Sequence, residues 1–165
     1  YRGENAVLEE NIDSLIIRTN FFGWGPRYRI SFSDFVINSL RLGKKIYLFE
    51  DVYFNPILIS ELVEKIHKLI DVSALGIFNI VSDEKISKLD FGIKIAEIFN
   101  LNKNLIMESS INDSNLAVLR PKDMTLSNEK YKSKIANSVF ISFSDQIKQL
   151  LNQEKKDIFN IIKLL

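Results

Sequence analysis

The chain has 165 residues, the length of about one ordinary domain, and its composition of 46% hydrophobic and 26% charged residues excludes a disordered tail. Its 22 basic and 21 acidic residues leave a net charge of +1, too small a basic excess for a nucleic-acid surface, and the absence of cysteine excludes disulfides and thiol catalysis. No apolar run approaches the roughly 18 residues that cross a bilayer, and the acidic start lacks a signal-peptide pattern, so we expect a cytoplasmic protein without a membrane partner.

The first elements are a helix end, a strand and an aromatic loop. The chain begins at Tyr1 rather than Met, and the acidic stretch 3–11 reads as the tail of a helix, which predicts a segment of a longer protein. The apolar run 15–17, ended by Arg18, is typical of a buried strand. The loop 19–29 that follows is rich in glycine and aromatic residues. Ligands tend to bind at the carboxyl ends of such strands, so this loop is a candidate site.

A helix-start signal recurs along the chain as a serine followed three residues later by an aspartate, which together can satisfy the free amides of a first helical turn. The helix after Ser31 presents one apolar stripe and should close at Gly43. The helix after Ser87 is apolar around almost its whole circumference, so we expect it to be deeply packed. The signals are Ser31 with Asp34, Ser87 with Asp90, and Ser142 with Asp145.

A further helix is expected from about Leu58 to Ile70, with apolar residues on one side. His67, the only histidine, falls on its polar side and is expected to be solvated; with no cysteine, a transition-metal site is not expected. Charged residues at i, i+3 and i, i+4 spacing also predict a solvated face, and they are Glu61, Glu64, Lys65 and Lys68.

Short apolar runs between the helices predict strands at 46–49, 76–81 and 105–107. Strands that alternate with helices imply a mixed or parallel sheet with helical cover. The polar stretch 108–120 is expected to be a loop. The final stretch, 155–165, is expected to form a short amphipathic helix that could pack internally or against a second copy in a homodimer.

Three places carry candidate binding residues, each with a structural alternative. Gly23-Trp24-Gly25 is no phosphate fingerprint, because neither G-x-G-x-x-G nor G-x-x-x-x-G-K-[ST] occurs in the sequence. The aromatic residues around it either are buried in a tight turn or form a wall for a ring-shaped ligand. Arg120 precedes Pro121, which disfavours helix there, and suits bidentate contact with phosphate or carboxylate, or else a surface salt bridge. Asn55 before Pro56 forms a turn or borders a cleft.

Five stretches, in order, resemble motifs of one enzyme family. Gly3-Glu4 is similar to the end of a Y-x-x-x-K-x-x-G-E helix, and LIIRTNFFG at 15–23 is similar to IIRTSWxYG. The stretch LFEDVYFNPILISEL at 48–62 is similar to DDQxGxPTxxxDLA, and FNIVSDEKISKLDFGIKIAEIF at 78–99 is similar to YHxxGxxxxSWYEFAxxIFE. The last stretch, LRPKDMTLSNEK at 119–130, is similar to RPxNSxLDxSKL. The chain thus resembles the carboxy-terminal half of an extended short-chain dehydrogenase/reductase, and within that superfamily the dTDP-4-dehydrorhamnose reductase group.

The resemblance implies an α/β fold: the C-terminal part of a Rossmann-like NAD(P)-binding fold plus the small mixed α/β substrate-binding subdomain. Residues 1–165 would be a single fragment, with the N-terminal nucleotide-binding half missing. The general-acid tyrosine and its lysine would lie before residue 1, so no catalytic residue is expected in this chain. A second registration makes Tyr1 that tyrosine, but Asn5 then replaces the lysine.

By the same resemblance, the full-length protein would reduce the 4-keto group of a deoxysugar nucleotide with NAD(P)H, in dTDP-rhamnose and polysaccharide biosynthesis, and the fragment alone would be inactive. Its partner would be a nucleotide-diphosphate sugar. Implied roles are nicotinamide contact for Thr19 and Asn20, the sugar pocket for Phe21 and Phe22, the cleft border for Asn55, and pyrophosphate binding for Arg120.

Three alternatives stay open from the sequence. An epimerase or dehydratase of the same superfamily would use the same pocket. A non-catalytic regulatory or binding subunit would share the fold but lack an intact catalytic motif upstream. A plain interaction domain would have the loop aromatics in its core and Arg120 directed away from the loop 20–25.

Overall fold

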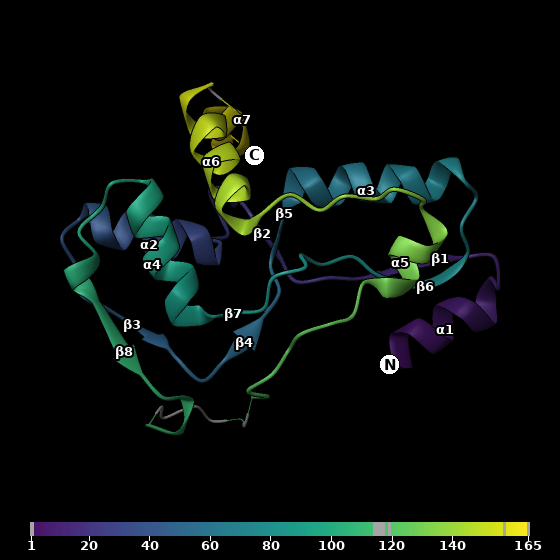
Figure 1. The fold of residues 1–165 in the computed structure, drawn as a ribbon, viewed down its shortest axis with the longest axis horizontal. Helices are drawn as coiled ribbons and strands as arrows, with labels where there is room; N and C mark the ends of the chain where they lie inside the picture. The colour runs from purple at the N-terminus through teal and green to yellow at the C-terminus, as the bar shows by residue number, and fades with distance from the viewer. Residues whose placement is uncertain (1, 114–117, 119, 157, 165) are drawn as a thin grey trace.

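The computed structural model describes residues 2–113, 118, 120–156 and 158–164. Two groups of helices and strands lie side by side, each built around a pair of parallel strands (Figure 1). The first group contains α1 (Arg2–Glu10), β1 (Leu15–Arg18), α3 (Ile59–Asp71), β6 (Gly76–Asn79) and α5 (Glu129–Lys134). The second contains α2 (Phe32–Arg41), β3 (Ile46–Phe49), α4 (Lys88–Ile98) and β8 (Ile106–Ser109).

Two short strand pairs and two helices connect these groups. β2 (Phe21–Phe22) pairs in parallel with β5 (Ile57–Leu58), and β4 (Tyr53–Phe54) pairs antiparallel with β7 (Ile86–Ser87). The helices α6 (Phe143–Lys155) and α7 (Ile158–Leu164) stand together next to β2 and β5 (Figure 1). The expected mixture of strands under helical cover is therefore present, as four separate two-stranded sheets in the described part of the chain.

The predicted strands are present, with two corrections. β1 is half-buried rather than buried, because within the described residues it pairs only with β6. The stretch 108–120 is not loop throughout: β8 continues to Ser109, where it pairs with Phe49, and Ile111–Asp113 forms a 3₁₀ turn. Residues 114–117 and 119 of that predicted loop lie outside the described residues.

All three predicted serine caps form, which explains where α2, α4 and α6 begin. Each serine hydroxyl oxygen accepts a hydrogen bond from the backbone N–H of the aspartate three residues later, at 3.0, 2.9 and 3.1 Å. Gly43 ends α2 with a left-handed φ of +66°, a conformation that glycine adopts without strain. The predicted deep packing of α4 is also confirmed: Phe91, Ile95 and Ala96 are fully buried. Gly92 lies so close to Leu48 that an added Cβ would be 2.2 Å from a Leu48 methyl carbon.

The solvated face predicted for α3 is only partly correct. His67 is exposed as expected. Glu61 and Lys65 are buried and form an ion pair at 2.8 Å, and the Lys65 ammonium also donates to the carbonyl oxygen of Val139. The chain between α5 and α6 runs along α3 and covers this side of the helix (Figure 1). The periodicity of α3 alone carries no information about that distant segment.

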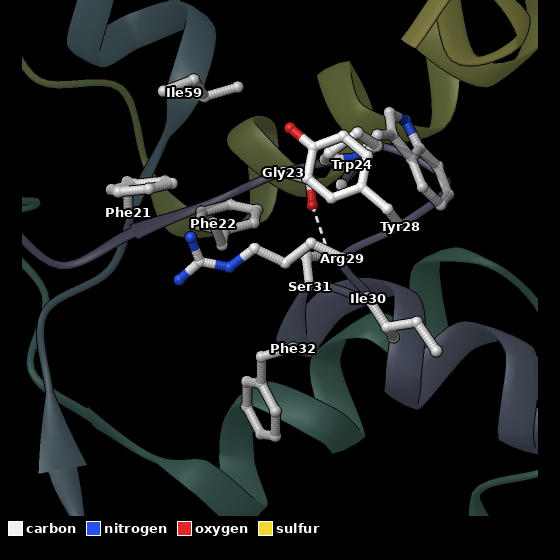
Figure 2. A pocket seen from close by; sticks show the side chains of 12 residues that line it. Phe21, Phe22, Gly23, Trp24, Tyr28, Arg29, Ile30, Ser31, Phe32 and Ile59 are labelled. Carbon is white, nitrogen blue, oxygen red and sulfur yellow. Dashed lines mark hydrogen bonds between the residues drawn. The ribbon is translucent and has the colours of Figure 1, made fainter. Parts of the chain in front are cut away.

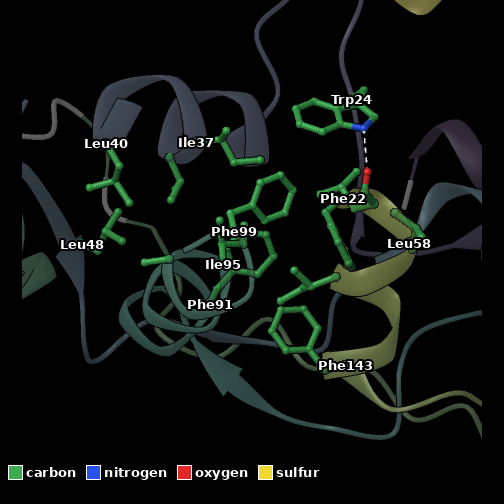
Figure 3. Close-up of a cluster of buried hydrophobic side chains, with 14 of the residues drawn as sticks. Phe22, Trp24, Ile37, Leu40, Leu48, Leu58, Phe91, Ile95, Phe99 and Phe143 are labelled. Carbon is green, nitrogen blue, oxygen red and sulfur yellow. Dashed lines mark hydrogen bonds between the residues drawn. The ribbon is translucent and has the colours of Figure 1, made fainter. Parts of the chain in front are cut away.

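Aromatic rings dominate the larger of two hydrophobic clusters (Figure 3). Phe22 packs edge-on against Phe91 and Phe143, with ring centroids 5.4 and 5.6 Å apart. Trp24 donates its indole N–H to the carbonyl oxygen of Leu150 at 3.1 Å, which ties the loop after β2 to α6. A smaller cluster, which includes Leu69 and Phe78, lies between α3, β6 and α5.

The C-terminal helix packs internally. The predicted amphipathic helix at 155–165 is α7, which starts at Ile158; residues 157 and 165 lie outside the described part. Phe159 and Ile162 pack against the larger cluster, whereas Ile161 is 61% exposed. Of the helices that the structure describes, none combines the length and apolar character needed to span a bilayer.

Candidate functional site

Two asparagine side chains join segments that are far apart in sequence. Asn55 is 6% exposed, and its Nδ2 donates to the carbonyl oxygens of Ser82 at 3.2 Å and Leu126 at 2.8 Å. Its Oδ1 accepts from the backbone N–H of Leu126 at 3.1 Å. Asn20 donates from Nδ2 to the carbonyl oxygen of Met124 at 2.8 Å. The loop after β1, the β4–β5 junction and the segment that contains Met124 and Leu126 therefore converge.

These hydrogen bonds bear on the role expected for Asn55. Both of its amide protons and its oxygen already have protein partners, so no group is left for a ligand. It also lines neither of the two cavities described below. In this structure the Asn55 side chain therefore connects the β4–β5 junction to the segments that contain Ser82 and Leu126. In the sequence, the only signal was an asparagine before a proline. That pattern does not distinguish a buried asparagine from one that borders a cleft.

The first cavity has a volume of about 460 Å³ and lies over the loop after β1 (Figure 2). Phe21 and Phe22 both line it, but their environments differ: Phe21 is 62% exposed, and Phe22 is 4% exposed and belongs to the core. Trp24, also a lining residue, is buried. Of the two interpretations of this loop, the buried turn holds for Phe22 and Trp24, and Phe21 is available as a wall for a ligand.

The loop is held rigidly by the start of α2. The Asp34 carboxylate accepts hydrogen bonds from the backbone N–H groups of Gly25 at 2.8 Å and Ser31 at 3.1 Å. Lys163 of α7 pairs with the other oxygen of Asp34 at 2.9 Å. An added Cβ at Gly25 would lie 2.3 Å from the carbonyl oxygen of Arg29, so only glycine fits there. These contacts hold the cavity wall in one shape.

Sequence reasoning missed Arg29. Its guanidinium extends across Phe22 towards Phe21 and lines the first cavity (Figure 2). The signal was present as a basic residue in the same aromatic loop, but several basic residues occur there and nothing local distinguishes the one that faces the cavity.

The second cavity has a volume of about 370 Å³ and contains Arg120. Arg120 is exposed and lines it together with Pro121 and Met124. Phe32 lines both this cavity and the first one, so the two cavities adjoin at that ring. The further lining residues are Phe35, Tyr47, Leu48, Phe49, Val52, Lys88 and Ile111. Arg120 and the aromatic loop therefore line adjacent cavities on either side of Phe32.

Asp51 connects chain segments that border the second cavity. Its carboxylate accepts from the ammonium of Lys122 at 2.8 Å, the backbone N–H of Ile111 at 2.9 Å and the hydroxyl of Ser110 at 2.8 Å. These contacts, with that from Lys122 the largest, hold the pKa of Asp51 well below its usual range. The ionised carboxylate thereby connects the segment after Arg120 to the ends of β3 and β8.

Lys88, which sequence reasoning also missed, lies in the second cavity at the first residue of α4. Its Nζ is 3.3 Å from the ring centroid of Phe54 and 4.6 Å from that of Phe32. Burial lowers the pKa of Lys88 to about 8. The sequence held one signal for Lys88: it stands where the family motif S-W-Y-E-F has tryptophan.

Thr19 follows β1, where the resemblance implies contact with a nicotinamide cofactor. Its hydroxyl oxygen is buried and has no hydrogen-bond partner among the described residues, so it fits a position next to a polar ligand group. The side-chain amide of the neighbouring Asn20 donates to the carbonyl oxygen of Met124. For metals, the described residues contain no group of three or more His, Asp or Glu side chains that could hold an ion.

Known proteins share this fold. A curated relative, the probable low-salt glycan biosynthesis reductase Agl14 of Haloferax volcanii, is 31% identical over 124 residues, which is 73% of this chain and 41% of the relative. The dTDP-4-dehydrorhamnose reductase of Clostridium acetobutylicum superposes with a TM-score of 0.81 at 20% identity, covering 93% of this chain and 53% of that one. The Bacillus anthracis dTDP-4-dehydrorhamnose reductase, solved with NADP, gives a TM-score of 0.75 at 21% identity, covering 84% and 48%.

The chain therefore spans about half the length of these proteins or less. The structural likeness confirms the expected Rossmann-like α/β fold. A family model matches residues 1–156, almost the whole sequence. This match shows that the chain belongs to the RmlD substrate binding domain family.

Proposed function

We propose that this chain is the substrate-binding part of an NAD(P)-dependent reductase that acts on the 4-keto group of a deoxysugar attached to a nucleoside diphosphate. The observation that carries the proposal is the pair of adjoining cavities that share Phe32, one over the loop after β1 and one containing Arg120. A nucleotide sugar has two chemically distinct ends, and two adjoining cavities suit them. The family and the reductase names of its relatives support the same class.

Each part of the substrate has a matching group in the chain. The guanidinium of Arg120 can contact a diphosphate with two parallel hydrogen bonds, which fixes that end. The exposed ring of Phe21 gives the sugar an apolar face in the first cavity. Phe32 separates the two ends, so that a ligand bound through Arg120 presents its sugar to the loop after β1.

A nicotinamide cofactor would supply the hydride that reduces the keto carbon, and the oxygen of that group would take up a proton. The unpartnered hydroxyl of Thr19, at the carboxyl end of β1, is the group of this chain that best suits contact with the cofactor. The sequence contains no Y-x-x-x-K motif of its own. We therefore assign binding and orientation, and no proton transfer, to these residues.

The test is turnover by the full-length protein that carries this chain. With NADPH or NADH and a 4-keto-deoxysugar nucleotide, we expect loss of the reduced-nicotinamide absorbance and formation of the 4-hydroxy sugar. Formation of an isomerised or dehydrated sugar without net cofactor oxidation would instead indicate an epimerase or dehydratase. Tight binding of the nucleotide sugar without any turnover would indicate a non-catalytic binding subunit.

A further inference from the structure

We propose that Lys88 is a second cation of the diphosphate subsite, facing the same cavity as Arg120 and held without a counterion among the described residues until the substrate binds. This inference rests on the proposed function, which supplies the diphosphate. It adds a residue that the resemblance did not implicate, because the corresponding motif position is tryptophan.

The position of Lys88 is set by its neighbours. It starts α4 directly after the capping residue Ser87, and its backbone N–H donates to the carbonyl oxygen of Val52 at 3.0 Å. Its ammonium lies above the Phe54 ring and near the Phe32 ring, with centroid distances of 3.3 and 4.6 Å. These two rings direct the charge into the cavity that Arg120 also lines.

Lys88 is half-buried, and it differs from two other lysines that have limited exposure. Lys65 is paired with Glu61 at 2.8 Å, and Lys163 with Asp34 at 2.9 Å. Within the described residues, the Lys88 ammonium has neither a carboxylate partner nor a hydrogen bond, and it lies over the Phe54 ring and near the Phe32 ring. A desolvated cation that lacks a counterion is costly, so proteins usually pair such groups.

The helix geometry adds to this cost. The N-terminus of a helix carries a partial positive charge, which disfavours a cation in its first turn. The carboxylate in that turn, Asp90, is engaged with the hydroxyl of Ser87 at 2.7 Å. A bound dianion between Lys88 and Arg120 would relieve both the desolvation of the ammonium and its repulsion from the helix end.

The cavity also suits the rest of a nucleoside diphosphate. Its volume of about 370 Å³ falls within the usual range for small-molecule sites. Phe35 and Tyr47 line it and are 42% and 67% exposed, so their ring faces can stack on a planar base. Two cations beside aromatic rings therefore match a diphosphate attached to a base.

The experiment measures binding of free nucleoside diphosphates to the full-length protein by calorimetry. The probes are dTDP, UDP, GDP and CDP, and the cofactor site is saturated with NADP⁺ so that the probes cannot occupy it. The variants are Lys88→Met, which removes the charge but keeps an apolar chain of similar length, and Lys88→Arg, which keeps the charge. The matched control is Lys94→Met, on the same helix, where the lysine is exposed and pairs with Glu97 at 3.4 Å.

We expect Lys88→Met to raise the Kd of the best-bound probe by about tenfold or more, as for loss of a charge-assisted hydrogen bond. Lys88→Arg should stay within about threefold of the wild type, and Lys94→Met should be unchanged. Equal binding by Lys88→Met and the wild type would overturn the role of Lys88 and leave the proposed function standing. An equal loss in Lys88→Met and Lys88→Arg would also overturn it, since the charge would not be the cause. If no probe binds the wild type, the proposed function fails and the inference fails with it.

Discussion

The side-chain amide of Asn20 donates a hydrogen bond to the backbone carbonyl oxygen of Met124, at 2.8 Å and across 104 positions of sequence. Asn55 makes the equivalent connection to Leu126, two residues further along. These contacts place the segment after Arg120 against the loop after β1, so the two adjoining cavities depend on them.

Replacing Asn55 with alanine should therefore lower the free energy of unfolding by about 1–3 kcal/mol, because it removes the partners of the buried Ser82 carbonyl and of two half-buried backbone groups of Leu126. Urea denaturation followed by circular dichroism measures this change. Asn104→Ala, at an exposed position, should have little effect. Equal stability of the two variants would contradict the role of Asn55 in connecting these segments.

Truncation of Phe22 should destabilise the protein far more than truncation of Phe21. Phe22→Ala removes a buried ring that packs against Phe91 and Phe143, and should cost about 3–5 kcal/mol of stability. Phe21→Ala removes a ring that is 62% exposed, and should change stability by less than about 1 kcal/mol. Thermal melts measure both. In the proposed function, only Phe21→Ala yields a folded protein with a raised KM for the sugar nucleotide.

Arg120→Ala should weaken nucleotide-sugar binding by about 1–3 kcal/mol, the range for losing a charged hydrogen bond. Titration of the full-length protein with a nucleotide-diphosphate sugar measures this. Arg27→Ala, an exposed arginine of the loop that lines neither cavity, serves as the control. Unchanged affinity in Arg120→Ala would remove this residue from the diphosphate subsite.

The buried ion pair on α3 should be costly to break. Lys65→Met leaves the carboxylate of Glu61 buried without its partner and should destabilise the protein by about 3–5 kcal/mol. The double variant Glu61→Gln with Lys65→Met should recover a large part of that loss, because no unpaired charge remains. Chemical denaturation of both variants checks this, and a Lys65→Met protein as stable as the wild type would mean that the pair is solvated after all.

Lys88 should make stability depend on pH in the alkaline range. Burial lowers its pKa to about 8 from the usual 10.5, so between these values the unfolded chain binds more protons than the folded one. Wild-type stability should therefore gain a contribution on the order of 1–3 kcal/mol as the pH rises from 8 towards 10.5. In Lys88→Met this contribution should be absent, and the difference between the two proteins isolates it from other groups. Parallel stability–pH curves for the two proteins would contradict the shifted pKa.

The amino-acid sequence by itself determined the features that depend on neighbouring residues. The three Ser-x-x-Asp caps, the end of α2 at Gly43 and the apolar character that lets α4 pack deeply follow from side chains within one or two helical turns. The order of the motifs also identified the family, and Arg120 does line a cavity.

Tertiary structure decided which of these side chains are covered, and by what. The buried pair on α3 depends on a segment that returns to it from more than 70 residues away, since Lys65 reaches Val139 across 74 positions. The side-chain amide of Asn55 is paired with the backbone of Leu126, 71 positions away, and the residues next to Asn55 in sequence do not specify that partner. Lys88 acquires its environment only when folding brings its ammonium close to the Phe32 ring and into the cavity that Arg120 also lines. Local hydrogen bonding is encoded within a few residues, whereas burial and electrostatic environment arise from segments that only folding brings together.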